Sequence, residues 1–414
     1  MNVNELAGLA ASSAEDEDLI ARCAERATAL LHANLGPLGF FAATPGAGAR
    51  QRGYDRVFGR DAAICAIAAA HCGDGELIAG AERSLLALSA QQAANGQIPK
   101  YVDGEENSAD FWYLGCIDAT LWWLIAVAHL ARRVSGLQRR LCGPVGRAIA
   151  WLSCQEHQQI FLLQQNEASD WADIMPRSGF VLYSNALWYY VKGLYRLPHA
   201  SATGEHFNYL FHPFGQHRAD YKRLRLFIHF ARNKPVSSEM YLSFVNLGYW
   251  GEEGDVFGNL LATLFGLADE HRTNRILARI ERNQVGAAYP VRVTCMPIGR
   301  GDPYWRTYMG RHQQNLEYCY HNGGIWPFVG GFWVLALAAA GRQPQAAREL
   351  AGLARANAAN GWRFTEWFHG LTGQPEGMPG QSWNAAMFLL ARHGLDNRVF
   401  RRIYDTGEGA WAGG

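Results

Sequence analysis

The chain has 414 residues, of which 49% are apolar, and its 38 basic and 37 acidic side chains give a formal net charge of +1. This composition excludes an intrinsically disordered chain, and the lack of a basic excess argues against a nucleic-acid partner. No apolar run reaches the length of a membrane span, so no membrane partner is expected.

The eight cysteines show no CxxC spacing, and several lie within apolar helical patterns. We therefore expect reduced thiols in the core of a cytoplasmic protein, with no metal and no cofactor. Residues 1–18 have neither a basic segment nor a long apolar core, so no secretory signal is predicted. A homo-oligomer is left open.

Most of the chain shows the apolar spacing of helices in consecutive pairs, joined alternately by short turns and long loops. Paired helices with long loops at one end fit a toroid of two concentric helix rings, with an open helical array as the alternative. We predict an all-α single domain over residues 1–414. The predicted helices cover residues 14–34, 62–72, 75–95, 111–133, 138–156, 181–195, 255–267, 270–282, 325–340, 343–358, 382–392 and 397–404.

Residues 198–250 break this pattern and predict a small irregular excursion with some β character. The stretch mixes aromatic and basic side chains with four histidines, His206, His212, His217 and His229. Their spacing is not that of a compact metal site, so none is proposed.

Two carboxylates, Asp170 and Asp173, lie in a loop before the predicted helix at 181–195. An unpaired carboxylate is costly to bury, whereas loops on a rigid scaffold commonly carry catalytic groups. We predict Asp173 as the general acid of a glycosidase, with Asp170 as a support for the loop. A helix cap remains the alternative for either acid.

A glycosidase usually needs a second carboxyl group, and Glu366 is the best candidate. It lies between Phe364, Trp367 and Phe368, and such a partly dry site raises a carboxyl pKa. A general base must be poised to hold a water molecule. The alternatives are an exposed glutamate on a strand and the rival Glu376, which has the pattern of a turn residue.

Sugar hydroxyls would need donors and acceptors, which the pair Arg60 and Asp61 supplies at the start of a predicted helix. A salt bridge with a helix cap is the alternative for this pair. The glycines of the Tyr320–Pro327 stretch permit a tight turn. The further polar and aromatic candidates are His321, Asn322, Trp326, Trp305, Arg306, Gln381 and Trp383.

Together these stretches resemble glycoside hydrolases built on an (α/α)6 barrel. The likeness is to the catalytic domain of glycogen-debranching amylo-α-1,6-glucosidases and to the alkaline/neutral invertases. The motifs that carry it are Phe58-Gly-Arg-Asp61, Ile117-Asp-Ala-Thr-Leu-Trp122, Trp171-Ala-Asp173 with Pro176-Arg177 and Asn185-Ala-Leu-Trp188, Tyr320-His-Asn-Gly-Gly-Ile-Trp-Pro327, and Thr365-Glu-Trp-Phe-His-Gly370 with Gln381-Ser-Trp383.

The resemblance covers roughly residues 54–392 and implies an inverting enzyme with Asp173 as acid and Glu366 as base. Arg60 and Asp61 would hold the terminal glucosyl unit, and Trp171 and Arg177 join the expected binding residues. The debranching enzymes usually carry an additional N-terminal domain for which there is no room here, so a short α-glucoside is the expected substrate.

Three alternatives remain. Invertase-type hydrolysis of sucrose is the first, because the Tyr320–Pro327 stretch is closest to the invertase form. A sugar epimerase or isomerase on the same barrel would require several histidines in the pocket. A carbohydrate-binding protein without activity is the third.

Overall fold

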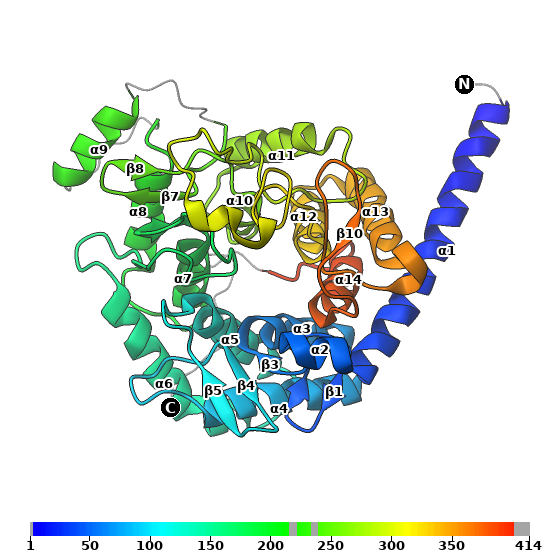
Figure 1. Ribbon diagram of the computed structural model, residues 1–414, viewed down its shortest axis with the longest axis horizontal. Helices are drawn as coiled ribbons and strands as arrows, with labels where there is room; N and C mark the ends of the chain where they lie inside the picture. Colours follow the sequence, from blue (N-terminus) through cyan, green and yellow to red (C-terminus); the bar gives the residue numbers. More distant parts are fainter. Residues whose placement is uncertain (1–2, 215–221, 233–238, 401–414) are drawn as a thin grey trace.

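The computed structural model describes residues 3–214, 222–232 and 239–400. Six helices of this part of the chain form a closed inner ring, in which each packs on the next and the last packs on the first (Figure 1). This closure confirms the toroid and rules out the open array. The inner helices are α3 (Gly59–Cys72), α5 (Ile117–Leu130), α7 (Leu182–Leu194), α10 (Val256–Leu264), α12 (Pro327–Ala339) and α14 (Ser382–Gly394).

The outer helices differ from the inner ones in how much of their surface is buried. All nine residues of α10 are buried, whereas α11 buries Thr273, Ile276, Leu277 and Ile280, which form one stripe at helical spacing. The extent of the apolar surface of a helix therefore indicates whether it lies in the inner or the outer ring. The outer helices are α1 (Val3–Ala33), α4 (Gly75–Ala90), α6 (Leu137–Gln155), α8 (Ala200–Phe211), α11 (Glu270–Gln284) and α13 (Gln343–Trp362).

Short turns such as 73–74 and 340–342 lead from inner to outer helices, and long loops such as 91–116, 156–181 and 285–326 lead back. The N-terminal ends of the inner helices therefore share one face with the long loops. Short elements within these loops are α2 (Ala47–Arg52), α9 (Lys222–Arg232), the 3₁₀ helix η1 (Thr307–Gln313), β1 (Leu35–Gly36), β2 (Gly39–Phe40), β3 (Val57–Phe58), β4 (Tyr101–Asp103), β5 (Ser108–Asp110), β6 (Phe180–Val181), β7 (Phe244–Asn246), β8 (Tyr249–Trp250), β9 (Trp367–Phe368) and β10 (Pro375–Glu376).

The strands of the described residues form four small antiparallel sheets, and their registers tie distant loops together. The order β3-β4-β5 places Phe58 opposite Tyr101, and the order β6-β7-β8 places Phe180 opposite Val245. The other two sheets are the hairpins β1-β2 and β9-β10. These pairings hold the loops over the ends of the inner helices.

The prediction of an irregular excursion at 198–250 is wrong in its first part. Residues 200–211 form the regular outer helix α8, whose buried residues Thr203, Phe207, Leu210 and Phe211 make one apolar stripe. Helix α9 and strands β7 and β8 follow, so the expected β character is present. His217 lies outside the described residues.

Several predicted helix boundaries are also wrong: α1 begins at Val3 instead of residue 14, and α4 ends at Ala90 instead of residue 95. The helix expected from residue 111 begins only at Ile117, because Trp112 and Gly115 have left-handed backbones and the Asp110 carboxylate accepts the Trp112 N–H. Residues 397–400 are not helical, and the chain there packs Phe400 against His129 and Tyr190. Residues 401–404 lie outside the described part.

All eight cysteines are free, but Cys72, Cys142 and Cys154 are exposed, so the expectation of core thiols is wrong for these three. Among the described residues, no helix has both the length and the apolar character that a bilayer span requires.

Candidate active site

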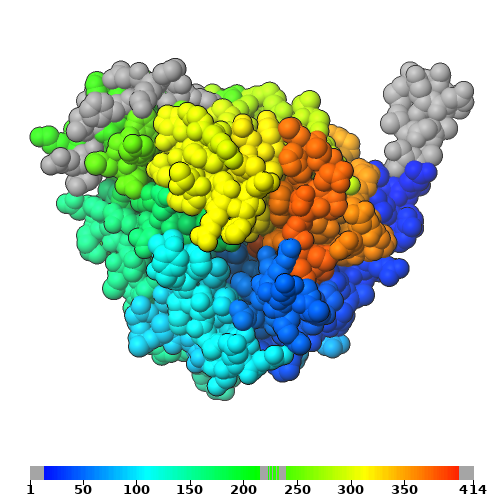
Figure 2. Space-filling view, in the orientation of Figure 1, coloured from blue at the N-terminus to red at the C-terminus, as the bar shows by residue number. Residues whose placement is uncertain are grey.

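A cavity of about 290 Å³ opens on the long-loop face. The surface in Figure 2 is hollowed near its centre, where the blue, cyan, yellow and orange segments meet. Eight of the residues predicted from sequence line this cavity, although they come from loops and inner-helix N-termini that are far apart in the chain. They are Arg60, Asp61, Trp171, Asp173, His321, Trp326, Glu366 and Trp383.

Glu366 is 5% exposed and lies just before the β9-β10 hairpin. The Tyr54 hydroxyl donates to its Oε1 (2.7 Å), and the Met378 N–H donates to its Oε2 (2.8 Å). Gly377 has a φ of 74°, and a Cβ there would lie 2.3 Å from Glu366 Oε2, so the site requires glycine. Burial raises the pKa of Glu366 to about 7, which is a useful value for proton transfer near neutrality.

Asp173 is held by the loop that carries it. Trp171, two residues earlier, is buried with its ring edge-on to His321, at 4.6 Å between centroids. The Asn315 side chain donates to the carbonyl oxygen of Asp173 (3.0 Å). These contacts fix the backbone, and the half-buried Asp173 side chain lines the cavity.

Asp170 supports the same loop from inside, as an accepting carboxylate. Its Oδ1 accepts the Ala172 N–H (2.8 Å), and its Oδ2 accepts from the Gln165 side chain (2.8 Å). Burial raises the pKa of Asp170 to about 7. The side chain orients the loop and is not among the residues that line the cavity.

The charges of Asp173 and Glu366 affect the pKa of the same two tyrosines, Tyr54 and Tyr320. Burial raises the pKa of Tyr54, and the charges of Glu366 and Asp173 raise it further. Burial and the charges of Asp173 and Glu366 likewise raise the pKa of Tyr320. The two carboxylates therefore belong to one electrostatic site.

Arg60 and Asp61 lie at the start of α3. The Arg60 Nη1 donates to Asp118 Oδ2 (3.0 Å), and its guanidinium lies over the Trp383 ring at 5.5 Å. The N-cap of α3 is Phe58, so Asp61 does not cap this helix. Burial raises the pKa of Asp61 to about 6.

Several polar atoms of the cavity wall are buried and make no hydrogen bond with the described residues. Buried polar groups are normally paired, and a sugar, which offers both donors and acceptors, would satisfy this set. The atoms are Arg60 Nε, Asp61 Oδ2, Trp171 Nε1, Trp383 Nε1, and both ring nitrogens of His321.

His321 is the histidine that the described residues contribute to this cavity. Its ring stacks on Trp326 at 4.7 Å, and burial lowers its pKa well below the usual range, so it is neutral. The other histidines considered within the described part do not line the cavity. An epimerase that works through several histidines is therefore not supported.

Arg177 and Asn322 were predicted to bind substrate, but they lie elsewhere. Arg177 is 2% exposed, donates to Glu253 Oε1 (3.0 Å) and lies 3.2 Å from Asp255 Oδ1. The Asn322 side chain donates to the carbonyl oxygens of Ile298 and Asn315. Both residues are held by protein groups, so the structure gives them positions within the scaffold.

Trp305, Arg306 and Gln381 do not line the cavity either. Arg306 is partly exposed beside Glu167, with Nε 3.7 Å from Oε1. Gln381 is fully buried, and its side chain donates to the Met378 carbonyl oxygen (3.3 Å). The rival acid Glu376 is exposed on β10.

Other lining residues were missed by the sequence reasoning. Tyr54 and Phe58 lie in the stretch that ends at Asp61, and Tyr320 begins a motif already identified, so their neighbours were a usable signal. Lys100 and Tyr101 reach the cavity through the pairing of β3 with β4, which no local pattern shows. The missed residues are Ala42, Arg52, Gly53, Tyr54, Arg56, Phe58, Lys100, Tyr101 and Tyr320.

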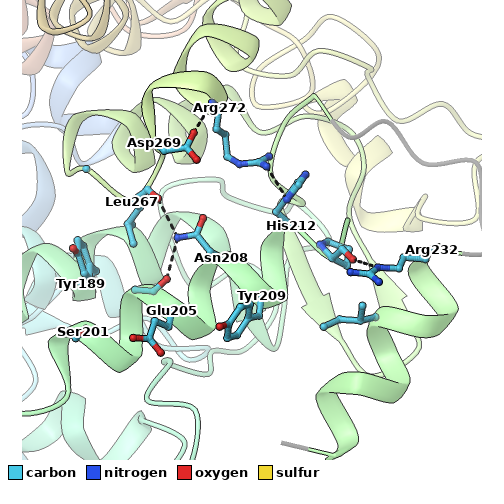
Figure 3. Close-up of a pocket in the computed structure, with 14 residues that line it drawn as sticks. Tyr189, Ser201, Glu205, Asn208, Tyr209, His212, Arg232, Leu267, Asp269 and Arg272 are labelled. Carbon is cyan, nitrogen blue, oxygen red and sulfur yellow. Dashed lines mark hydrogen bonds between the residues drawn. The ribbon is translucent and has the colours of Figure 1, made fainter. Parts of the chain in front are cut away.

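A second cavity, of about 720 Å³, is lined by residues of α7, α8, α9 and α11 and their connections (Figure 3). Its Arg272 contacts His212 Nδ1 (2.8 Å), and Asp269 caps α11 by accepting the Arg272 N–H (2.7 Å). Its other acid, Glu205, is exposed. This cavity is larger, but its acids are a helix cap and a solvated side chain, so it lacks the buried acids of the smaller one.

The chain matches the family model of alkaline and neutral invertases over residues 255–398. Cytosolic invertase 1 of Oryza sativa subsp. japonica is 32% identical over 148 residues, which are 34% of this chain and 25% of the rice protein. A probable alkaline/neutral invertase D of Arabidopsis thaliana is also 32% identical over 148 residues, which are 34% of this chain and 26% of the plant protein. The matches thus span about a quarter of these relatives. The residues matched by the family model include His321, Trp326, Glu366 and Trp383.

Solved structures extend the likeness to the whole ring. A GH63 mannosylglycerate hydrolase from Thermus thermophilus, in complex with Tris and D-glycerate, has a TM-score of 0.60 at 16% identity and covers 89% of this chain and 99% of its own. A wild-type glycosidase has a TM-score of 0.57 at 16% identity, with 96% and 99% covered. The (α/α)6 fold and the resemblance to glycoside hydrolases of this fold are confirmed.

Proposed function

We propose that this chain is an inverting glycoside hydrolase that releases glucose from a short α-glucoside. The observation that carries the proposal is that Asp173 and Glu366, from two separate loops, line one cavity together with buried polar atoms that make no hydrogen bond within the described residues. A cavity of about 290 Å³ is at the small end of ligand pockets. It favours a short substrate over a polymer.

In the mechanism, Asp173 donates a proton to the glycosidic oxygen as the bond to the anomeric carbon breaks. Glu366 accepts a proton from a water molecule that attacks the opposite face of the sugar. The Tyr54 hydroxyl and the Met378 N–H orient Glu366 and favour its charged form. Arg60 and Asp61 hold the sugar hydroxyls. The assignment of acid and base follows the motif resemblance.

Sucrose is the second candidate substrate, because the invertase match covers the part of the cavity that contains His321 and Glu366. Sucrose is a short α-glucoside and is consistent with the same acid and base. Debranching of a glucan is supported by sequence motifs alone. Assays with sucrose, trehalose, isomaltose and malto-oligosaccharides would rank these substrates.

Replacement of Asp173 by Asn and of Glu366 by Gln tests the pair directly. Each variant should lose about 10²–10⁴-fold in kcat/KM while its Tm stays within a few degrees of the wild type. Glu376→Gln is the matched control, because this exposed acid lies on the neighbouring strand. Turnover near the wild-type rate in either Asp173→Asn or Glu366→Gln would refute the proposal.

The two roles can be separated with α-glucosyl fluoride, whose leaving group needs no proton. Asp173→Asn should regain most of its lost rate on this substrate, whereas Glu366→Gln should remain impaired. If Glu366→Gln regained its rate on this substrate instead, Glu366 would be the general acid and Asp173 the general base.

A further inference from the structure

Two basic side chains line the cavity without an acidic partner among the described residues. The side chain of Arg52, at the end of α2, makes no ion pair or hydrogen bond with this part of the chain. Lys100, which precedes β4, lies over the Trp112 ring at 4.4 Å and likewise has no described acid within ion-pair distance. The neighbouring Arg56, by contrast, is held by Asp103 at 2.7 Å.

The positions of these cations differ from those of the acids. Asp61 and Glu366 are 6% and 5% exposed, so they lie on the deep wall. Arg52 is exposed and Lys100 half-buried, which places both nearer to solvent. In an enzyme that holds the terminal glucosyl unit in the deep part, the leaving group extends toward the mouth and meets these cations.

From this arrangement we propose that the leaving group of the natural substrate carries a carboxylate or phosphate, which Arg52 and Lys100 bind. A neutral leaving group would leave both cations without a counter-charge. A charge-assisted hydrogen bond to an anion is about twice as strong as a neutral one. The inference rests on the proposed function and narrows its substrate class.

The deep acids do not provide an alternative partner. Arg52 is close enough to Glu366 to lower its pKa, and Lys100 acts in the same way on Asp61, but neither cation is within 4.0 Å of a carboxylate oxygen of the described residues. Asp61 is instead nearest to Arg60, at 3.8 Å. The two cations thus remain available to a ligand at the mouth.

The test compares substrates that differ in one group. Glucosylglycerate and glucosylglycerol share the glucosyl unit and differ in a carboxylate or a hydroxymethyl group, and sucrose 6-phosphate and sucrose form a phosphate pair. In at least one pair the anionic member should have the higher kcat/KM, by about tenfold or more. A preference within the first pair would identify the anion as a carboxylate, and a preference within the second would identify it as a phosphate.

The variants Arg52→Gln and Lys100→Met should each lower this ratio by about tenfold. The ratio is the readout because Arg52 also acts on Glu366, and that effect is common to both members of a pair. Arg50→Gln is the control, since Arg50 lies on the same helix but pairs with Asp55 and Glu105 outside the cavity. It should leave the ratio unchanged.

Equal kcat/KM within both pairs would overturn the inference while the proposed function stands. If no α-glucoside is hydrolysed, the proposed function fails and the assignment to a leaving group fails with it, and calorimetry then tests only whether Arg52 and Lys100 form an anion site. Glycerate or inorganic phosphate should then bind the wild type more tightly than glycerol does, and Arg52→Gln should remove the difference. Equal binding of glycerate, phosphate and glycerol would refute it.

Discussion

Arg60 and Arg177 are both buried arginines paired with buried acids, yet they lie in regions of opposite character. Arg60 is on the wall of the cavity, and its Nε has no hydrogen-bond partner among the described residues. Arg177 lies between Glu253 and Asp255 in an enclosed ionic cluster. Arg177 Nη1 and both carboxylate oxygens of Asp255 also make no hydrogen bond within the described residues, so the two regions differ in access. Arg60 lines a cavity that a ligand can enter, whereas Arg177 is enclosed by its ion-pair partners.

The largest expected effect is on stability, in the enclosed cluster. Arg177→Met leaves Glu253 and Asp255 buried without a counter-charge, which should lower the free energy of unfolding by about 3–5 kcal/mol. Urea titration measures this loss. A change below about 1 kcal/mol would show that the cluster contributes little and would remove the contrast with the cavity.

In the cavity, Asp61→Asn should cost activity and not stability. Loss of charged hydrogen bonds to the sugar should lower kcat/KM by about 10²-fold. The folded pKa of Asp61, about 6, lies above its ordinary value of 3.8, so its ionisation opposes folding as pH rises through this interval. The variant should therefore be at least as stable as the wild type at about pH 7.5, with this relative gain absent at about pH 3.5.

Thermal unfolding of the variant and the wild type at both pH values, together with a measurement of kcat/KM, checks this prediction. A variant that loses stability at the higher pH without losing activity would reverse the roles assigned to the two regions.

A smaller effect is expected from Tyr54→Phe. The hydroxyl stabilises the charged form of Glu366, so its removal raises the pKa of the base. The acidic limb of kcat/KM against pH, expected near pH 7, should move upward by roughly one pH unit. The limb would stay in place if Glu366 were not the group that titrates.

The smallest effect is expected from Arg306→Gln. This partly exposed ion pair with Glu167 lies outside both regions, so stability should change by less than about 0.5 kcal/mol. The kcat/KM should stay within about twofold. A large loss would place Arg306 in the substrate path, as its sequence pattern first indicated.

The fold was predictable because each helix carries its own apolar pattern and the long loops alternate with short turns. The site was predictable in part, because acids close to aromatic residues are unusual on any loop: Asp173 follows Trp171 by two residues, and Glu366 lies between Phe364 and Trp367. Arg177 could not be separated from Arg60, because its partners Glu253 and Asp255 follow more than 70 residues later and only the fold brings them together. Helix α8 was obscured because it begins a stretch, 198–250, in which histidines are mixed with aromatic and basic side chains.

The most direct test of the central claim is the anomeric form of the sugar released first, followed by proton NMR as an α-glucoside is hydrolysed. The account predicts β-glucose as the first product, appearing at a rate that Asp173→Asn and Glu366→Gln both reduce by orders of magnitude. Initial release of α-glucose would contradict it, because one water held by Glu366 opposite Asp173 can only invert the anomeric centre.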